Sequence, residues 1–198
     1  MALTSRHATF PARLSYNDLF VPRAANEGAD PKYQAVLLVP KDDAKTIGLL
    51  QAAINEAVKD GVARGKIKAP IDPQQTLYPP LRDGDKPKND GESRGEAFAG
   101  HLFVSAKANA DRKPFIVDQQ AQPLIDTEEI YSGCYVNACV EFYVYASQGN
   151  VGVAATIVGV QKVKDGERLG AAPVTAEDVF SAIGGQPAIN APSANLGF

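Results

Sequence analysis

Residues 132–146 carry the pattern that most restricts the fold, because apolar and polar side chains alternate there without a break. Even-numbered positions are small or apolar throughout: Cys134, Val136, Ala138, Val140, Phe142 and Val144. Odd-numbered positions mix tyrosines with polar groups: Tyr135, Asn137, Cys139, Glu141, Tyr143 and Tyr145. Since successive side chains of a β-strand point to opposite faces, this segment predicts a strand with one face in the core. The letters SQGN at 147–150 separate it from a second apolar run at 151–163, which predicts a long β-hairpin.

Further strands are predicted where branched and aromatic residues cluster, at 9–22, 32–40, 101–108 and 114–118. Apolar residues at helical spacing predict one main helix over 41–61, where Ile47, Leu50, Ile54 and Val58 share a face. The chain is therefore expected to be mainly β, with a single main helix.

The stretch 63–100 contains five Pro and five Gly among many charged residues, which predicts a long loop of the kind that is usually functional or disordered. A Thr175 cap predicts a short helix at 175–183. Residues 184–198 hold no charged side chain and are expected to form a flexible tail. These features predict one folded domain over 1–183, followed by the tail.

Charge and cysteine content exclude several classes of function. The net charge is −3, yet residues 59–113 hold eleven Lys/Arg against eight Asp/Glu, so any anion-facing surface is expected in the middle of the chain. Cys134 and Cys139 differ by five positions, which places them on opposite faces of a strand and excludes both a shared metal and a disulfide. We expect no metal and no cofactor, and two cysteines alone favour a reducing compartment.

Nothing in the sequence points to catalysis. Ser105 and His101 would be about 13 Å apart along a strand, and no nucleophile-elbow motif occurs. The protein is therefore not expected to be an enzyme. The sequence also has no signal-peptide core and no apolar run of membrane-spanning length, which predicts no membrane contact and a cytosolic location.

The tyrosine-bearing face of 132–146 has a counterpart in 101–108, where His101, Phe103, Ser105 and Lys107 share one side. Flat aromatic rings beside cations are what single-stranded nucleic acids bind, because bases stack on the rings and phosphates pair with the cations. Strand alternation therefore predicts Tyr135, Tyr143, Phe103 and Lys107 as DNA-binding residues.

The loops add Tyr78, Arg82, Arg112 and Lys113, and we expect the basic set Arg82, Lys86, Lys88 and Arg94 to form a wall beside the tyrosine face. On pattern alone, tyrosines that simply fill a half-buried sheet surface are the commoner explanation. A protein-interaction module of a virion or assembly protein, using the same tyrosine-rich face, is the alternative function.

A family resemblance favours the DNA-binding hypothesis. The segments that carry it are RLSYNDLFVP, PKYQAVLLVPKDD, PLRDGDKP, RKPFIVD, IYSGCYVNACVEFYVYASQGNVGVAA, VQKVKDGERLG and TAEDVF, which lie between residues 13 and 180. In this order they resemble a phage and prophage single-stranded DNA-binding protein family.

The resemblance implies an OB-fold, a five-stranded and partly open barrel with an inserted helix and long loops. It implies sequence-independent binding of single-stranded DNA in phage replication and recombination, in the cytoplasm of the infected bacterial host, with phage or host replication proteins as possible partners. The motif positions that it carries over are 131–135, 82–85, 100–103 and 112–114. The tail departs from the acidic tails of many such proteins, because no acidic residue follows Asp178.

Overall fold

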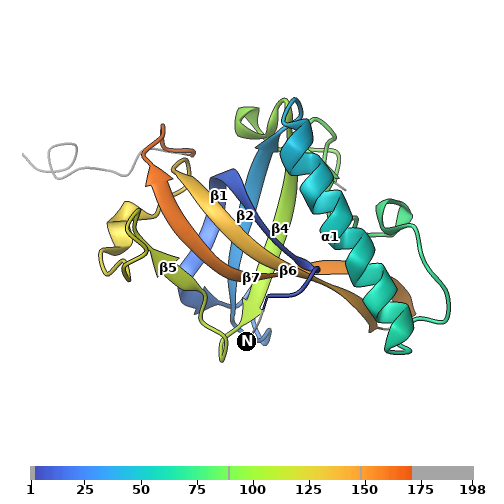
Figure 1. Ribbon diagram of the computed structural model, residues 1–198. Coiled ribbons are helices and arrows are strands. Elements are labelled where there is room, and N and C mark those ends of the chain that lie inside the picture. The colour runs from blue at the N-terminus through green and yellow to red at the C-terminus, as the bar shows by residue number, and fades with distance from the viewer. Residues whose placement is uncertain (1–2, 89, 148, 171–198) are drawn as a thin grey trace, which may run out of the picture.

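The computed structural model describes residues 3–88, 90–147 and 149–170. Five of its strands close into a barrel in the order β1 (His7–Arg23), β2 (Lys32–Pro40), β4 (His101–Asn109), β7 (Asn150–Lys164) and β6 (Tyr135–Ser147), and β6 pairs back with β1 (Figure 1). Neighbouring strands are antiparallel except β4 and β7, which run parallel and meet at Ala106 and Ala155. The expected mainly-β, OB-fold-like barrel with five strands is confirmed, and it is closed.

The barrel interior is filled as the alternation in β6 predicts. Its even-numbered side chains, from Val136 to Val144, are all buried in one core cluster, while Tyr135 and Tyr143 are 36% and 37% exposed. The predicted hairpin is confirmed, since β6 and β7 pair along their whole length down to Ser147 and Asn150. Burial of one complete strand face fixes the register, because a slip of one residue would turn that face to solvent.

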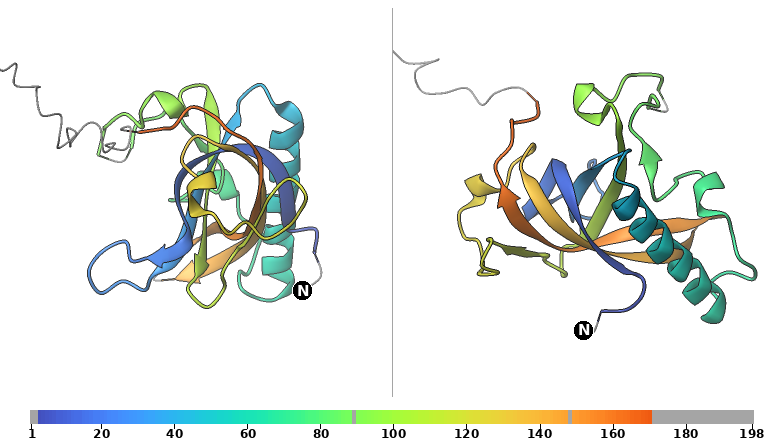
Figure 2. Two further views of the ribbon diagram at one scale, coloured as in Figure 1. Left: turned by 90° about the vertical axis from the view of Figure 1, so that its left-hand side faces the viewer. Right: turned by 45° about the horizontal axis from the view of Figure 1, so that its top comes forward.

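The single long helix, α1 (Ala44–Ala63), is inserted between β2 and β4 and packs mainly against β6 and β1 (Figures 1 and 2). The Asp43 carboxylate caps its start by accepting the N–H of Thr46 at 3.0 Å. Its buried face includes Leu50 and Ile54, which belong to the core cluster of the barrel. The prediction of one main helix near 41–61 is confirmed.

Short elements complete the described chain: η1 (Pro73–Gln75), β3 (Arg82–Asp83), η2 (Glu96–Phe98), β5 (Phe115–Val117) and η3 (Thr127–Glu129). β3 pairs antiparallel with an edge of β4, where Arg82 lies opposite Phe103. β5 pairs parallel with β7. The stretch 63–100 is thus a long loop, as predicted, but a part of it is anchored to the sheet. The predicted helix at 175–183, the tail at 184–198 and the domain boundary between them lie outside the described residues.

Candidate nucleic-acid interface

Two arginines lie on the ring of Phe103 at the outer surface of the barrel. The guanidinium carbons of Arg82 and Arg94 are 4.6 Å and 4.9 Å from the ring centroid. Phe98 packs edge-on against the same ring, with 5.2 Å between the two centroids. We call the depression above these groups the arginine hollow; its lining consists of Tyr16, Val36, Arg82, Lys88, Arg94, Phe98, Phe103 and Ser105.

The prediction that Phe103 offers an exposed ring for stacking is wrong. Phe103 points to the outer face of β4, as alternation predicts, but it is only 2% exposed because the returning segment 82–98 covers it. Strand alternation shows which face a side chain takes and says nothing about what a distant loop lays over that face. In the structure the ring of Phe103 packs beneath the two arginine side chains.

The two arginines of the arginine hollow have no acidic partner in the described chain, whereas Lys88 of the same lining is paired with Glu92 at 3.2 Å. Among residues 3–88, 90–147 and 149–170, neither Arg82 nor Arg94 has a carboxylate oxygen within 4.0 Å. Arg82 donates to the hydroxyl of Ser105, while its Nε is buried and has no hydrogen-bond partner within the described chain. Burial, and then the neighbouring Arg94, lower the pKa of Arg82, although a guanidinium remains charged at neutral pH. Two neighbouring cations without acidic partners are suited to an anion, and guanidinium groups bind phosphate with paired N–H donors.

Lys41 holds the segment around Asp83 and Asp85 against the barrel, and we call these three residues the lysine clamp. Lys41 Nζ lies 2.5 Å from an oxygen of Asp83 and 2.6 Å from an oxygen of Asp85. These hydrogen bonds raise the pKa of Lys41 and lower the pKa of both carboxyls. The second Asp85 oxygen accepts the N–H of Gly100 at 2.8 Å. Gly84 is required between the two acids, because a Cβ there would lie 2.2 Å from a carbonyl oxygen of η2. The motif positions 82–85 and 100–103 therefore contact each other, and these contacts hold Arg82 in place over Phe103.

Tyr16 lines the arginine hollow. The pairing of β1 with β2 shifts register between Ser15 and Asn17, and Tyr16 has a φ of 45°. Its N–H bonds to Ser132 Oγ at 3.1 Å instead of to a strand partner. This irregularity leaves the Tyr16 side chain 67% exposed, with its ring centroid 6.3 Å from that of Phe98. A ring in this position can accept a stacked base beside the two arginines.

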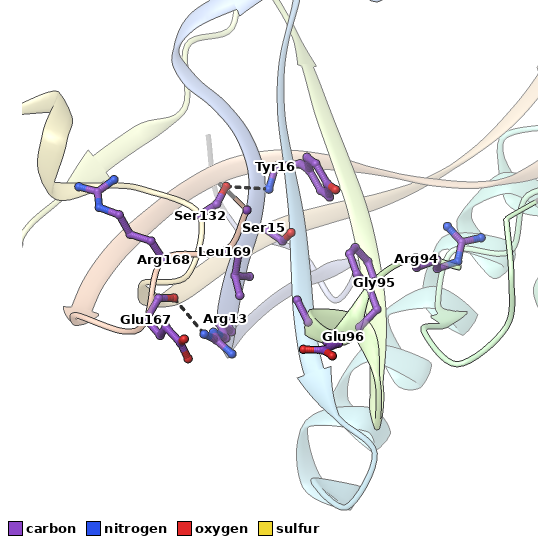
Figure 3. Close-up of a pocket in the computed structure, with 13 residues that line it drawn as sticks. Arg13, Ser15, Tyr16, Arg94, Gly95, Glu96, Ser132, Glu167, Arg168 and Leu169 are labelled. Carbon is purple, nitrogen blue, oxygen red and sulfur yellow. Dashed lines mark hydrogen bonds between the residues drawn. The ribbon is translucent and has the colours of Figure 1, made fainter. Parts of the chain in front are cut away.

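A second hollow adjoins the first and carries both signs of charge. Arg13 and Arg168 line it together with Glu96 and Glu167 (Figure 3). Arg13 Nη2 donates to the carbonyl oxygen of Glu167 at 3.0 Å. Arg94 lines the second hollow too, which therefore holds three arginines and two glutamates, whereas no acidic side chain of the described residues lines the arginine hollow.

The motif at 131–135 packs tightly against the segment 165–168. Gly133 has a φ of 118°, and a Cβ there would lie 2.0 Å from a carbonyl oxygen of the facing segment. The hydroxyl of Tyr131 accepts the N–H of Gly166 at 3.1 Å. These contacts give the motif a structural role. The ring of Tyr135 remains partly exposed next to the contact between the two segments.

Tyr78 and Arg82 are brought together, as the loop-based prediction requires. Tyr78 is 53% exposed, and a third hollow includes its ring with Lys86, Lys88, Arg82 and Arg94. The third hollow shares both arginines with the arginine hollow. The four cations expected to form a basic wall thus line one hollow together with Asp83 and Asp90, and no tyrosine of β6 lines it.

The remaining predicted residues lie in other places. Tyr143, Lys107 and Arg112 line a separate hollow, and Lys113 lies beside an exposed apolar group that includes Phe115. Tyr135 and Tyr143 are eight positions apart on β6, which separates them by about 26 Å. The tyrosines of β6 thus do not form one compact stacking platform.

Sequence reasoning missed Tyr16 and gave Arg94 no individual role. The signal for Tyr16 is present, because the alternation within 9–22 breaks near that position, and such a break is typical of a β-bulge. No local signal distinguishes Arg94 from the other cations of its loop, since its place over Phe103 depends on how the loop returns to β4.

Within the described parts of the chain, no group of three or more His, Cys, Asp or Glu side chains is arranged to hold a metal ion. Cys134 is buried, which raises the pKa of its thiol, and Cys139 is half-buried; neither forms a disulfide. The helix among these residues is not apolar enough over its length to cross a bilayer.

Comparison with solved structures identifies the fold. The single-stranded DNA-binding protein of bacteriophage Enc34, solved in complex with single-stranded DNA, is 24% identical, with 84% of this chain and 91% of that chain covered and a TM-score of 0.68. Gp2.5, a single-stranded DNA binding protein encoded by bacteriophage T7, is 15% identical, with 89% and 98% covered and a TM-score of 0.54.

Sequence comparison extends over most of the chain. Protein p50 of Acyrthosiphon pisum secondary endosymbiont phage 1 is 32% identical over 174 residues, which cover 85% of this chain and 88% of that protein. The family model of the Enterobacter phage Enc34 single-stranded DNA-binding protein matches residues 7–188. The resemblance inferred from the motifs is confirmed, and the chain belongs to the family of the Enterobacter phage Enc34 single-stranded DNA-binding protein.

Proposed function

We propose that this protein binds single-stranded DNA without sequence preference, with phosphates at the arginine hollow and bases on Tyr16 and Tyr78. The observation that carries the proposal is the pair Arg82 and Arg94, two guanidinium groups on one ring with no acidic partner among the described residues. Family membership supports the same ligand.

The position of the arginine hollow in the fold supports this choice of surface. OB-folds bind oligonucleotides on the outer face of their second and third strands. Those strands are β2 and β4 here, and the arginine hollow lies on their outer face, where Val36 pairs with Ser105. Two exposed tyrosines flank the arginines, and stacking on tyrosine tolerates any base because every base has a flat face.

We infer a role as a non-enzymatic coat of single strands during phage replication or recombination, in the cytoplasm of the infected bacterium. Its protein partners would be phage or host replication and recombination proteins. No assembly of side chains for catalysis stands out in the described residues, since Asp83 and Asp85 are both engaged by Lys41.

A salt titration of oligonucleotide binding tests the proposal. Fluorescence anisotropy should give tight binding of labelled oligo-dT that weakens steeply with salt, because bound phosphates release counterions, and much weaker binding of a duplex of equal length. Equal binding of the two ligands, or no binding of oligo-dT at low salt, would show that the proposal is wrong.

The alternative is a protein-interaction module, and the structure offers it a different surface from the one that the sequence suggested. Val21, Phe115 and Ile125 are 65%, 73% and 91% exposed. An apolar surface of this kind fits a protein contact, whereas the β6 tyrosines are only about one-third exposed and lie far apart. Binding of a partner protein that persists at high salt and is lost in the Phe115→Ser variant would favour this alternative.

A further inference from the structure

A second basic surface lies toward the carboxyl end of β4 and includes residues that directly follow α1. We call it the basal hollow. Its lining includes Lys32, Lys66, Lys107, Arg112, Glu141 and Tyr143.

The cations of the basal hollow fall into two groups. Arg6 and Arg64 are paired with acidic side chains, Arg6 with Glu141 at 2.8 Å and Arg64 with Asp60 at 2.9 Å. The other group is exposed and has no carboxylate within 4.0 Å in the described parts of the chain; it consists of Lys32, Lys66, Lys107 and Arg112. Arg6 neutralises the acidic residue of the lining, so the basal hollow keeps a positive charge.

An aromatic ring accompanies these cations. Tyr143 is 37% exposed and forms part of the same lining. Both hollows therefore hold a tyrosine together with some cations that have no acidic partner in the described chain.

The two hollows lie next to each other on one strand. Ser105 lines the arginine hollow and Lys107 lines the basal hollow. Both side chains take the outer face of β4, two residues apart, a separation of about 7 Å. A ligand that leaves the arginine hollow along β4 therefore reaches Lys107 without crossing another strand.

We propose that a single DNA strand bound at the arginine hollow continues along β4 into the basal hollow, where Lys66, Lys107 and Arg112 contact phosphates and Tyr143 stacks a base. This inference rests on the proposed function and extends it, because it assigns a second contact region and a longer binding site. The cations are exposed and spread over three elements, which suits a chain of spaced phosphates better than one small anion, for which donors would have to converge.

Oligonucleotide length separates the two contact regions. Wild-type protein is titrated with oligo-dT of about 6 and about 16 nucleotides, the range that one OB-fold covers. The test variant is Lys66→Ala/Lys107→Ala/Arg112→Ala. The control variant, Lys45→Ala/Lys59→Ala/Lys68→Ala, removes the same charge from residues that line neither hollow.

For the longer oligonucleotide, the test variant should show a slope of log Kobs against log salt that is flatter by about 2, since each lost phosphate contact on a single strand contributes about 0.7. Its affinity for the short oligonucleotide should be unchanged, and the control variant should behave like wild type with the long one. A test variant whose slope and long-oligonucleotide affinity match wild type overturns the inference. Failure of wild type to bind either oligonucleotide at low salt would instead count against the proposed function. Thermal melts of all three proteins show whether each is folded.

Tyr143→Ala supplies an independent measurement. It should weaken binding of the long oligonucleotide by about 5-fold or more and leave the short one unaffected, as expected for the loss of one stacked base. An equal loss with both lengths would place Tyr143 at the first contact region and contradict the proposed path.

Discussion

Replacing Arg82 with methionine should weaken DNA binding without weakening the fold. The Arg82 side chain is half-buried beside Arg94, and its buried Nε has no hydrogen-bond partner in the described chain. An unsatisfied buried donor costs about 1–3 kcal/mol, whereas a methionine keeps an apolar stem against the ring of Phe103. The substitution also removes the hydrogen bond from Arg82 to Ser105, so gain and loss offset each other and the free energy of unfolding should change by no more than about 1 kcal/mol.

The same substitution removes a charge-assisted contact to phosphate. Hydrogen bonds to charged groups contribute about 1.5–3 kcal/mol, which corresponds to a loss of affinity for oligo-dT of about 10- to 150-fold. The slope of log Kobs against log salt should become flatter by about 0.7 for the one lost contact. Anisotropy over a series of salt concentrations gives both values, and urea unfolding followed by circular dichroism gives the stability.

Arg23→Met is the matched control, because it removes the same group from a side chain that is 75% exposed and lies outside the arginine hollow. It should leave the affinity nearly unchanged. If Arg82→Met instead lowered the unfolding free energy by more than about 1 kcal/mol, its guanidinium would be a structural group, and the assignment of an unused donor would be refuted. Unchanged affinity and slope would refute the assignment of the phosphate contact.

Three further substitutions test single features of the structure. Tyr16→Gly should weaken oligo-dT binding as much as Tyr16→Ala, by about 1–3 kcal/mol, but should give the higher melting temperature of the two because glycine accepts the positive φ of 45°; equal melting temperatures would contradict that backbone conformation. Gly133→Ala should lower the melting temperature sharply, since its Cβ would lie 2.0 Å from a carbonyl oxygen, whereas Gly149→Ala, with nothing within 4 Å, should cost only about 1 kcal/mol. Because Lys41 lowers the pKa of Asp85, their pairing stabilises the fold above the carboxyl's unfolded pKa of about 4 and is lost as acid protonates it; Asp85→Asn should therefore reduce the acid dependence of urea unfolding below about pH 4, and an unchanged acid dependence would argue against the clamp.

Local pattern was sufficient for most of the fold. Alternation in 132–146 predicted which side chains of β6 face the core, and helical spacing predicted the face of α1, because both periods follow from backbone geometry. The motifs at 82–85 and 131–135 were also recognised from sequence, although their main tasks turned out to be a lysine clamp and a tight glycine contact.

The sequence by itself thus determined the strands, the helix, the inner and outer faces of the barrel and the family. Only the tertiary structure decided which outer-face residues remain accessible and which cations share a surface. Phe103 is covered because Lys41 ties a segment more than forty positions along the chain back onto β4. Tyr16 is exposed because β1 bulges against β2 and Ser132. Such contacts depend on closure of long loops onto a finished barrel, and residue periodicity within one segment carries no information about that closure.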